Sequence, residues 1–301
     1  MAERTDEQFR IVGANYKTYT PKKQRPSFWV KWKGKPFFSM IVLAAIVLCC
    51  IFAGYLSHHD PSDFYLENLN EAPNASYYFG TDSLGRDIYS MIWYGGRVSI
   101  MIGMLSMVII TVIGVTYGCI SGMAGAKIDA MMMRFAEILN SIPSLLLLLL
   151  LASIMGKQDI WKISFVIGVT GWFALARIVR SEVRQIRNSE YVLAARCMGA
   201  SFPHVMQKHL IPNFISAILF VVISSISTSM SMESTLSFLG LGLPTHIISW
   251  GSMLSLANRA LLSNTWWVIM IPGVFLLVTL LAITNIGNYF RKEVNRKASN
   301  L

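Results

Sequence analysis

The side chains best suited to binding another molecule lie in residues 190–213, a polar segment between two long apolar runs. Ala194 and Ala195 are small, so a second protein can bring its backbone or side chains close to them. Gly199 can adopt the left-handed conformation that ends a helix. These residue types predict a helix that another protein binds. An ordinary amphipathic helix at a membrane interface is the alternative interpretation.

A second short helix is expected after this glycine. Ser201 is a residue type that caps helices, and Pro203 suits an opening turn because the N–H that it lacks would be unpaired there anyway. Pro212 is expected to restart the chain into the next apolar run. The sequence therefore predicts a helical hairpin over residues 190–213.

Charged side chains also cluster in residues 79–87, which read Phe-Gly-Thr-Asp-Ser-Leu-Gly-Arg-Asp. Two glycines together with opposite charges at this spacing predict a tight turn that an ion pair locks. The charged members are Asp82, Arg86 and Asp87.

Hydroxyl groups are concentrated in the fifth apolar run, where Ser224, Thr228 and Ser231 share one helical face. Such hydroxyls either bond to their own backbone and a neighbouring helix, or line a wet path for a polar solute. Glu233 follows them, and an acid near membrane depth is a functional candidate. Its candidate partners are Arg259, a partner chain and a substrate ammonium.

Four arginines, Arg177, Arg180, Arg184 and Arg187, are spaced by three, four and three residues. This spacing places them on one face of a helix. We expect that face either to meet solvent and lipid headgroups or to contact an acidic surface of a partner protein.

Membrane-crossing helices are the elements that must position these groups. Of the 301 residues, 54% are hydrophobic and 14% charged, whereas soluble domains carry about 25% charged residues. A helix needs roughly 20 apolar residues to cross about 30 Å of hydrocarbon. Six runs qualify, at about 38–57, 98–121, 136–155, 160–178, 212–232 and 266–288.

Charge placement predicts that both termini lie in the cytosol. With six crossings, 21 of the 26 Lys and Arg residues fall on the cytosolic side, as the positive-inside rule expects. Residues 190–213 then face the cytosol and residues 79–87 lie outside. The first apolar run follows a basic tail of 37 residues, so we interpret it as a signal anchor. The basic charge requires no nucleic acid.

Two local signals predict how the helices pack and bend. Gly114, Gly118 and Gly122 recur every four residues, which predicts a contact seam between helices rather than a ligand site. Ile142-Pro143 is expected to interrupt the third span.

Residues 190–213 resemble the EAA loop of ABC-importer permeases, in which two alanines, a glycine four positions on and a later Ile-Pro recur. The consensus has Glu where this chain has Leu193, a departure that is usual in the peptide-importer branch. In that family the loop is the coupling helix that sits in a cleft of the ATP-hydrolysing subunit. The resemblance assigns this role to Glu190, Ala194, Ala195, Arg196, Gly199, Ser201, His204 and Pro212.

Residues 79–87 resemble the signature FGTDxxGRD, which precedes the second span in the C-type permeases of peptide and nickel importers. The resemblance implies that this segment shapes the outer vestibule or meets a substrate-binding protein. The strings KIDAMMMRFAEILNSIPSLLLL, SFLGLG and SWGSML extend the likeness over nearly the whole chain from residue 75. The signature positions are Gly80, Asp82, Gly85, Arg86 and Asp87.

The resemblance implies an all-α integral membrane protein of the bacterial cytoplasmic membrane. It would have six transmembrane helices, the type I ABC importer permease fold and cytosolic N- and C-termini. The expected parts are a basic cytosolic tail (1–37), a first transmembrane helix (38–57), an external segment (58–97), a five-helix permease core (98–288) with the cytosolic coupling loop (178–211), and a C-terminal tail (289–301).

The resemblance also implies a permease subunit that translocates oligopeptides or dipeptides by alternating access. The expected partners are a second homologous permease, two ATP-binding subunits, an extracellular or periplasmic substrate-binding protein and the lipid bilayer. The chain has no Gly-x-x-x-x-Gly-Lys-Ser/Thr loop. We therefore expect ATP and Mg²⁺ on the partners, and neither a cofactor nor enzymatic activity in this chain.

Two alternatives remain open. Nickel permeases share these motifs, and His58-His59-Asp60 would be an external metal site, although adjacent histidines in a polar loop are more often solvated. No metal site is therefore predicted. A non-ABC secondary carrier would hold carboxylates or histidines in mid-span, whereas the acids nearest the spans, Glu137 and Glu233, lie near span ends.

Overall fold

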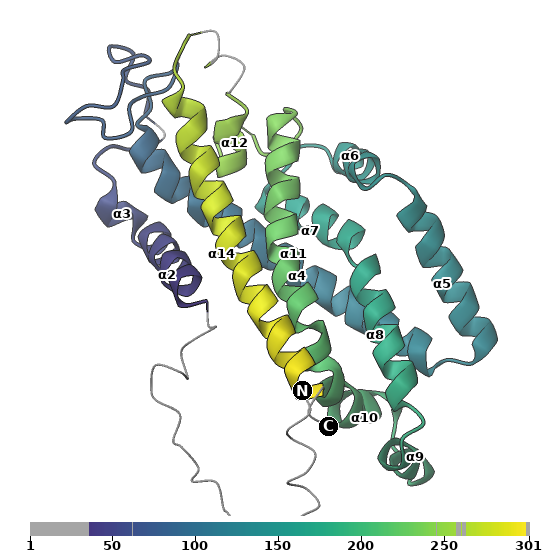
Figure 1. Cartoon of the computed structure of the whole chain (residues 1–301). Helices are drawn as coiled ribbons and strands as arrows, with labels where there is room; N and C mark the ends of the chain where they lie inside the picture. The colour runs from purple at the N-terminus through teal and green to yellow at the C-terminus, as the bar shows by residue number, and fades with distance from the viewer. Residues whose placement is uncertain (1–35, 62, 245, 257–259, 261–262, 299–301) are drawn as a thin grey trace, which may run out of the picture. The chain divides into compact units, whose positions relative to one another are not determined.

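Helices make up the computed structural model of the protein, in which one isolated β-bridge joins Thr81 to Asp87. The structure describes residues 36–298 except 62, 245, 257–259, 261 and 262, and within 294–298 it describes the backbone alone. The helices (Figure 1) are α2 (Phe37–Ile51), α3 (Ala53–Leu56), α4 (Ile88–Met123), α5 (Ala126–Ser141), α6 (Ser144–Ile154), α7 (Ile160–Gly171), α8 (Phe173–Ile186), α9 (Glu190–Cys197), α10 (Phe202–Val205), the π-helix η2 (Met206–Leu210), α11 (Ile211–Phe238), α12 (Trp250–Leu254) and α14 (Trp267–Ala298).

Every predicted apolar run falls in helical structure, but fewer than six helices meet the length and composition expected of a span. Among the described residues, three helices are long and apolar enough to cross a membrane, or up to five if each bent pair is one span. The run predicted at 38–57 corresponds to α2, an apolar helix of 15 residues, followed by the short α3.

Two pairs of consecutive helices are bent. The helices α5 and α6 meet at 87° across Ile142-Pro143, which confirms the predicted interruption. Proline ends a helix here because it lacks an N–H and disfavours helical backbone in the residue before it. The helices α7 and α8 meet at 47° around Trp172.

The glycine seam of α4 packs against α8, as predicted. A Cβ atom added to Gly118 would lie 2.6 Å from the backbone oxygen of Ala176, and one added to Gly122 would lie 2.7 Å from Cβ of Val183. The missing side chains thus let the two helices approach backbone to backbone. Besides α8, the helix α4 contacts α2, α7 and α11.

The short helix α12 fits between α4, α11 and α14. Its first residue, Trp250, is fully buried and donates its indole N–H to the backbone oxygen of Ile92 at 2.9 Å. The backbone N–H of Trp250 donates to the hydroxyl of Ser99 at 3.1 Å. These bonds fix α12 against α4, while α11 and α14 lie side by side (Figure 1).

Candidate functional site

The segment 190–210, here called the coupling segment, consists of α9, α10 and η2. The helix α9 turns Val192 inward to a cluster that contains Val183 of α8 and Phe214 of α11. Gly199 ends the hairpin's first arm with φ +82°, so the predicted left-handed backbone is confirmed. An added Cβ there would meet nothing within 4 Å. The turn is therefore open to a binding partner.

The outward face of the coupling segment differs from the prediction in one residue. Ala194 is exposed, but Ala195 is only 4% exposed and packs inside the chain's own core, so it is not available to a partner. Two exposed apolar side chains, Leu193 and Met198, lie on this face. Leu193 is the position at which the chain departs from the consensus, whereas Met198 had no sequence signal beyond its type. The predicted residues Glu190, Arg196, Ser201 and His204 are also exposed.

The second arm of the hairpin begins as predicted but does not end as predicted. Ser201 holds the extended N-cap position of α10 and Pro203 lies in its first turn, although the Ser201 side chain makes no capping hydrogen bond. Pro212 does not restart the chain, because α10, η2 and α11 form one uninterrupted helix over Phe202–Phe238. A π turn absorbs the proline: Ile211 N–H donates to the backbone oxygen of Met206, five residues earlier.

A buried carboxylate that the sequence analysis missed lies beside this hairpin. Asp129, in the first turn of α5, is 3% exposed. Arg180 donates from Nε to Oδ1 and from Nη2 to Oδ2 of Asp129, both at 2.5 Å. Arg184 donates to Oδ2 at 2.8 Å, and the hydroxyl of Ser121 donates to Oδ1 at 2.6 Å. The acid joins α4, α5 and α8.

The arginine stripe therefore serves the chain itself. Arg187 donates to the backbone oxygens of Gly122 and Ala124, at 3.0 and 3.1 Å. Arg180 and Arg184 bind Asp129, an intrachain contact that the spacing did not predict. The side chain of Arg184 is still 42% exposed, so contact with headgroups or a partner stays a prediction for this residue. Arg177 alone of the four makes no such bond and is exposed.

The predicted turn over residues 79–87 is confirmed. Nη2 of Arg86 lies 2.7 Å from Oδ2 of Asp82, and both residues are buried. Asp87 is not part of this pair; its carboxylate accepts the backbone N–H groups of Tyr89 and Ser90 and so caps α4. Backbone φ angles of +74° at Gly80 and +77° at Gly85 explain both glycines.

The two adjacent histidines do not converge on a metal site. The ring of His59 stacks on Tyr77 at 4.8 Å, while the ring of His58 meets Tyr78 edge-on at 5.3 Å. Nδ1 of His59 lies 3.7 Å from a carboxylate oxygen of Asp87. Within the described part of the chain, no three His, Cys, Asp or Glu side chains are placed to hold a metal ion.

Hydroxyl groups of α11 line a cavity of about 270 Å³ that α4, α6, α7 and α8 complete. Ser224 and Thr228 belong to its wall, as does Ser229. Among the described residues, the hydroxyls of Ser224 and Ser229 are buried and have no hydrogen-bond partner. Ser231 does not line this cavity and donates to the backbone oxygen of Ser227. The structure thus brings together two of the four residues predicted for a path.

Glu233 lies apart from that cavity and is fully buried. Its Oε1 accepts hydrogen bonds from the hydroxyls of Ser237 at 2.9 Å and Ser249 at 2.7 Å. Gly251 of α12 covers the carboxyl group, since a Cβ added there would lie 2.8 Å from Oε1. The predicted partner Arg259 lies outside the described residues.

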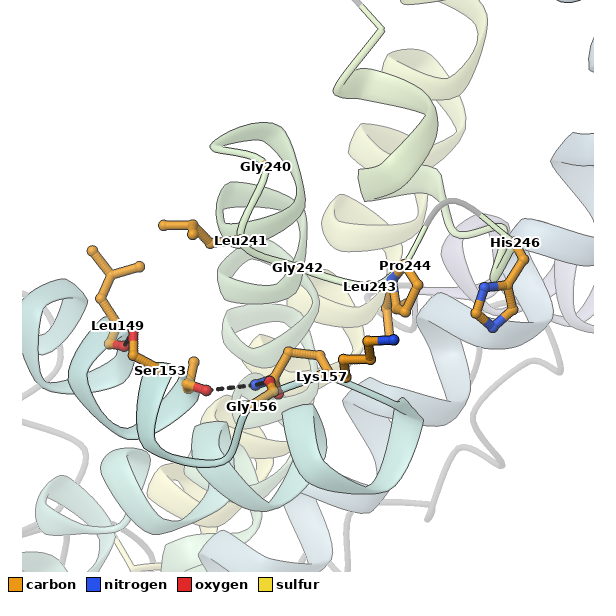
Figure 2. A pocket seen from close by; sticks show the side chains of 12 residues that line it. Leu149, Ser153, Gly156, Lys157, Gly240, Leu241, Gly242, Leu243, Pro244 and His246 are labelled. Atoms are coloured by element: carbon orange, nitrogen blue, oxygen red, sulfur yellow. Dashed lines mark hydrogen bonds between the residues drawn. The ribbon is translucent and has the colours of Figure 1, made fainter.

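A second cavity, of about 520 Å³, separates the end of α6 from the segment that follows α11 (Figure 2). Residues 240–244 of the apolar segment 236–244 form one wall, and Gly240, with φ +77°, turns the chain there. Gln158 closes the end of α6 by donating to the backbone oxygens of Ala152 and Gly156. The other lining residues are Leu149, Ser153, Lys157 and His246.

Two family models match the chain. One describes the binding-protein-dependent transport system inner membrane component and matches residues 114–296. The other describes the N-terminal TM domain of oligopeptide transport permease C and matches residues 37–73. Together they cover α2, α3, the last ten residues of α4 and the later helices up to residue 296.

Similar proteins include transport permeases from several bacteria. The oligopeptide transport system permease protein OppC of Bacillus subtilis is 38% identical over 258 residues, 86% of this chain and 84% of the relative. The dipeptide transport system permease protein DppC of the same organism is 36% identical over 86% of this chain and 80% of the relative. A solved chain of the MetNI methionine ABC transporter in inward-facing conformations shares the fold, with a TM-score of 0.54, 18% identity, and coverage of 68% of this chain and 96% of that chain.

Proposed function

Since the chain belongs to the family of binding-protein-dependent transport system inner membrane components, we propose that it is the C-type permease subunit of an ABC importer for oligopeptides or dipeptides. The relatives OppC and DppC belong to an oligopeptide and a dipeptide transport system, which supports a peptide cargo. The protein resides in the bacterial cytoplasmic membrane. Six spans and cytosolic termini are part of the proposal, with α2 as the first span.

The observation that carries the proposal is the open, partly apolar coupling segment. Its exposed side chains include Leu193, Ala194 and Met198, and the left-handed turn at Gly199 leaves room for a partner. A membrane protein that lacks a phosphate-binding loop must receive the energy of ATP from another subunit. We assign ATP and Mg²⁺ to two partner subunits that bind this segment from the cytosol.

The proposed mechanism is alternating access. A second homologous permease would complete the pathway, and an external substrate-binding protein would deliver the peptide. Differential contact of the coupling segment with two states of the ATP-binding subunits would drive the change. Because α10, η2 and α11 are one helix, such a movement reaches the cavity wall at Ser224 and Thr228 directly. Ser231 and Glu233 do not line this cavity, so the proposal does not assign them to its wall.

A substitution at Gly199 tests the docking role. Gly199→Leu adds a side chain at positive φ, at a strain of about 1–2 kcal/mol, and fills the space that a partner would occupy. Gly156→Leu is the matched control, since Gly156 has φ +70° and open space but lies between α6 and α7. We expect Gly199→Leu to reduce co-purification of the ATP-binding subunits and peptide import by about tenfold or more, while membrane insertion persists.

Equal co-purification and equal import in the two variants would contradict the docking role. Import of labelled peptides into vesicles with the complete importer also separates the cargo alternatives. Uptake of radioactive nickel in place of peptide would overturn the peptide assignment. Among the described residues, no three His, Cys, Asp or Glu side chains are placed to hold a metal ion.

A further inference from the structure

We propose that Asp129 is a positioning residue, which sets the place of the coupling segment by clamping α8 to the corner between α4 and α5. The inference rests on the proposed function, because it concerns how movement of ATP-binding subunits enters the helix bundle. Asp129 touches neither the exposed face of the coupling segment nor the hydroxyl-lined cavity. Its effect on transport must therefore pass through α8.

The chain connectivity makes α8 the support of α9. Only residues 187–189 separate the end of α8 from the start of α9. The first of them, Arg187, donates hydrogen bonds to two backbone oxygens at the α4–α5 corner, those of Gly122 and Ala124. The support of the coupling segment is thus tied to that corner at its last turn.

The bonds of Asp129 fix both the distance and the angle between α5 and α8. Arg180 binds both carboxylate oxygens, one with Nε and the other with Nη2, a paired geometry that restricts rotation as well as separation. Arg184, one helical turn later, adds a third bond from the same face of α8. Ser121 ties the same carboxylate to α4. A single acid therefore locks three helices.

Burial makes Asp129 dependent on these bonds. Its side chain is 5% exposed and has lost nearly all of its contact with water, while the side chains of Arg180 and Arg184 are 25% and 42% exposed. Removal of the charge of Asp129 leaves both guanidinium groups without their counter-ion. The same helix carries a contrasting pair, Arg134 and Glu137, whose side chains are 82% and 49% exposed. Exposed pairs of this kind contribute little to stability or geometry.

The apolar contacts show where the clamp transmits force. Val179 and Val183 of α8 belong to the same buried cluster as Val192 of α9 and Phe214 of α11. A push on α9 moves α8 and α11, and through Asp129 it also moves the α4–α5 corner. If the clamp is broken, α8 stays tied to the end of α4 through Arg187 but loses its tie to α5, so α5 no longer follows the movement of α9. Less peptide is then transported for each ATP consumed.

The decisive experiment uses the complete importer reconstituted in sealed lipid vesicles, with Asp129→Asn as the test variant. Asp129→Glu retains the charge, and Glu137→Gln removes a charge from an exposed site of the same helix. Peptide import and ATP hydrolysis are measured in the same preparation, so that their ratio reports coupling. We expect the ratio to fall by about tenfold or more in Asp129→Asn, to recover partly in Asp129→Glu, and to stay at the wild-type value in Glu137→Gln.

A distance measurement tests the clamp independently of transport. Spin labels are placed on Cys197, which is exposed in α9, and on an introduced Lys127→Cys at the exposed start of α5, with Cys49 replaced by Ser. We expect the distance distribution to broaden in Asp129→Asn and not in Glu137→Gln. This result is expected whatever the cargo is, so failure of the proposed function would leave it in place.

Two outcomes would overturn the proposal, and a third would support it. An unchanged distribution together with an unchanged coupling ratio in Asp129→Asn means that the acid positions nothing. Loss of assembly in Asp129→Asn, with wild-type coupling in the milder Arg184→Gln, means that the acid serves folding alone. A reduced coupling ratio in Arg184→Gln, with assembly intact, supports the clamp even if Asp129→Asn does not assemble.

Discussion

The hydroxyl of Ser249 donates a hydrogen bond of 2.7 Å to Oε1 of Glu233, and so joins the N-cap of α12 to a fully buried carboxyl group in α11. The two residues lie on separate elements, and Trp250 next to Ser249 is held in turn by α4. Glu233 therefore joins α11 to α12 through Ser249, and the neighbouring Trp250 joins α12 to α4.

Replacement of Glu233 by alanine is expected to destabilise the protein. The hydroxyls of Ser237 and Ser249 would lose their acceptor inside the core, at about 2–3 kcal/mol. Glu233→Gln keeps an acceptor oxygen and should lose less. The apparent midpoint of thermal unfolding in detergent measures both, with the exposed Thr235→Ala of the same helix as control. A midpoint of Glu233→Ala equal to that of the control would refute the prediction.

Close approach of α4 and α8 predicts opposite effects for the same substitution at two helical glycines. Gly118→Ala places its Cβ 2.6 Å from the backbone oxygen of Ala176, and the overpacking should destabilise by about 1–3 kcal/mol. Gly273→Ala in α14 meets its nearest atom at 3.9 Å. It should therefore gain the helix propensity of alanine, about 0.5–1 kcal/mol.

Thermal unfolding of the two purified variants checks this contrast. Equal shifts of the unfolding midpoint in Gly118→Ala and Gly273→Ala would mean that helix propensity outweighs packing at both sites, and that α4 and α8 are not tightly packed at Gly118.

Features with local causes could be predicted from the sequence. The break at Pro143 and the turn at Gly199 follow from the backbone freedom of single residues, and the pair of Asp82 with Arg86 spans only four positions. The glycine seam follows from spacing alone. In each case the signal and the structure that it produces lie within one or two helical turns.

The remaining features depend on contacts between distant segments. Asp129 and Arg180 are 51 residues apart, and no pattern in either helix indicates that they meet. The arginine spacing gave the correct face but not what lies opposite it. Ala195 could not be distinguished from Ala194 by type, because only the tertiary fold decides which alanine turns inward.

At Pro212 the tertiary structure overrides the local preference of the residue, because the helix continues through it. A proline inside a helix removes a backbone donor and clashes with the preceding turn, at about 3 kcal/mol in an ordinary helix. Here the wider π turn over Met206–Leu210 comes directly before it, and the side-chain amide of Asn213 donates to the backbone oxygen of His209 at 2.5 Å. The turn and the proline thus accommodate each other.

Pro212→Ala should therefore stabilise the helix and impair transport. The restored N–H favours α-helical hydrogen bonds through the π turn. A π turn holds one residue more than an α turn, so its conversion to an α turn shifts the register by one residue and rotates α10 by about 100° relative to α11. The face that carries His204 would then point away from the ATP-binding subunits. We expect an equal or higher unfolding midpoint together with reduced peptide import. Pro203→Ala, in the first turn of α10, changes no register and should import normally. Wild-type import by Pro212→Ala would show that the π turn only relieves the proline and does not orient the coupling segment.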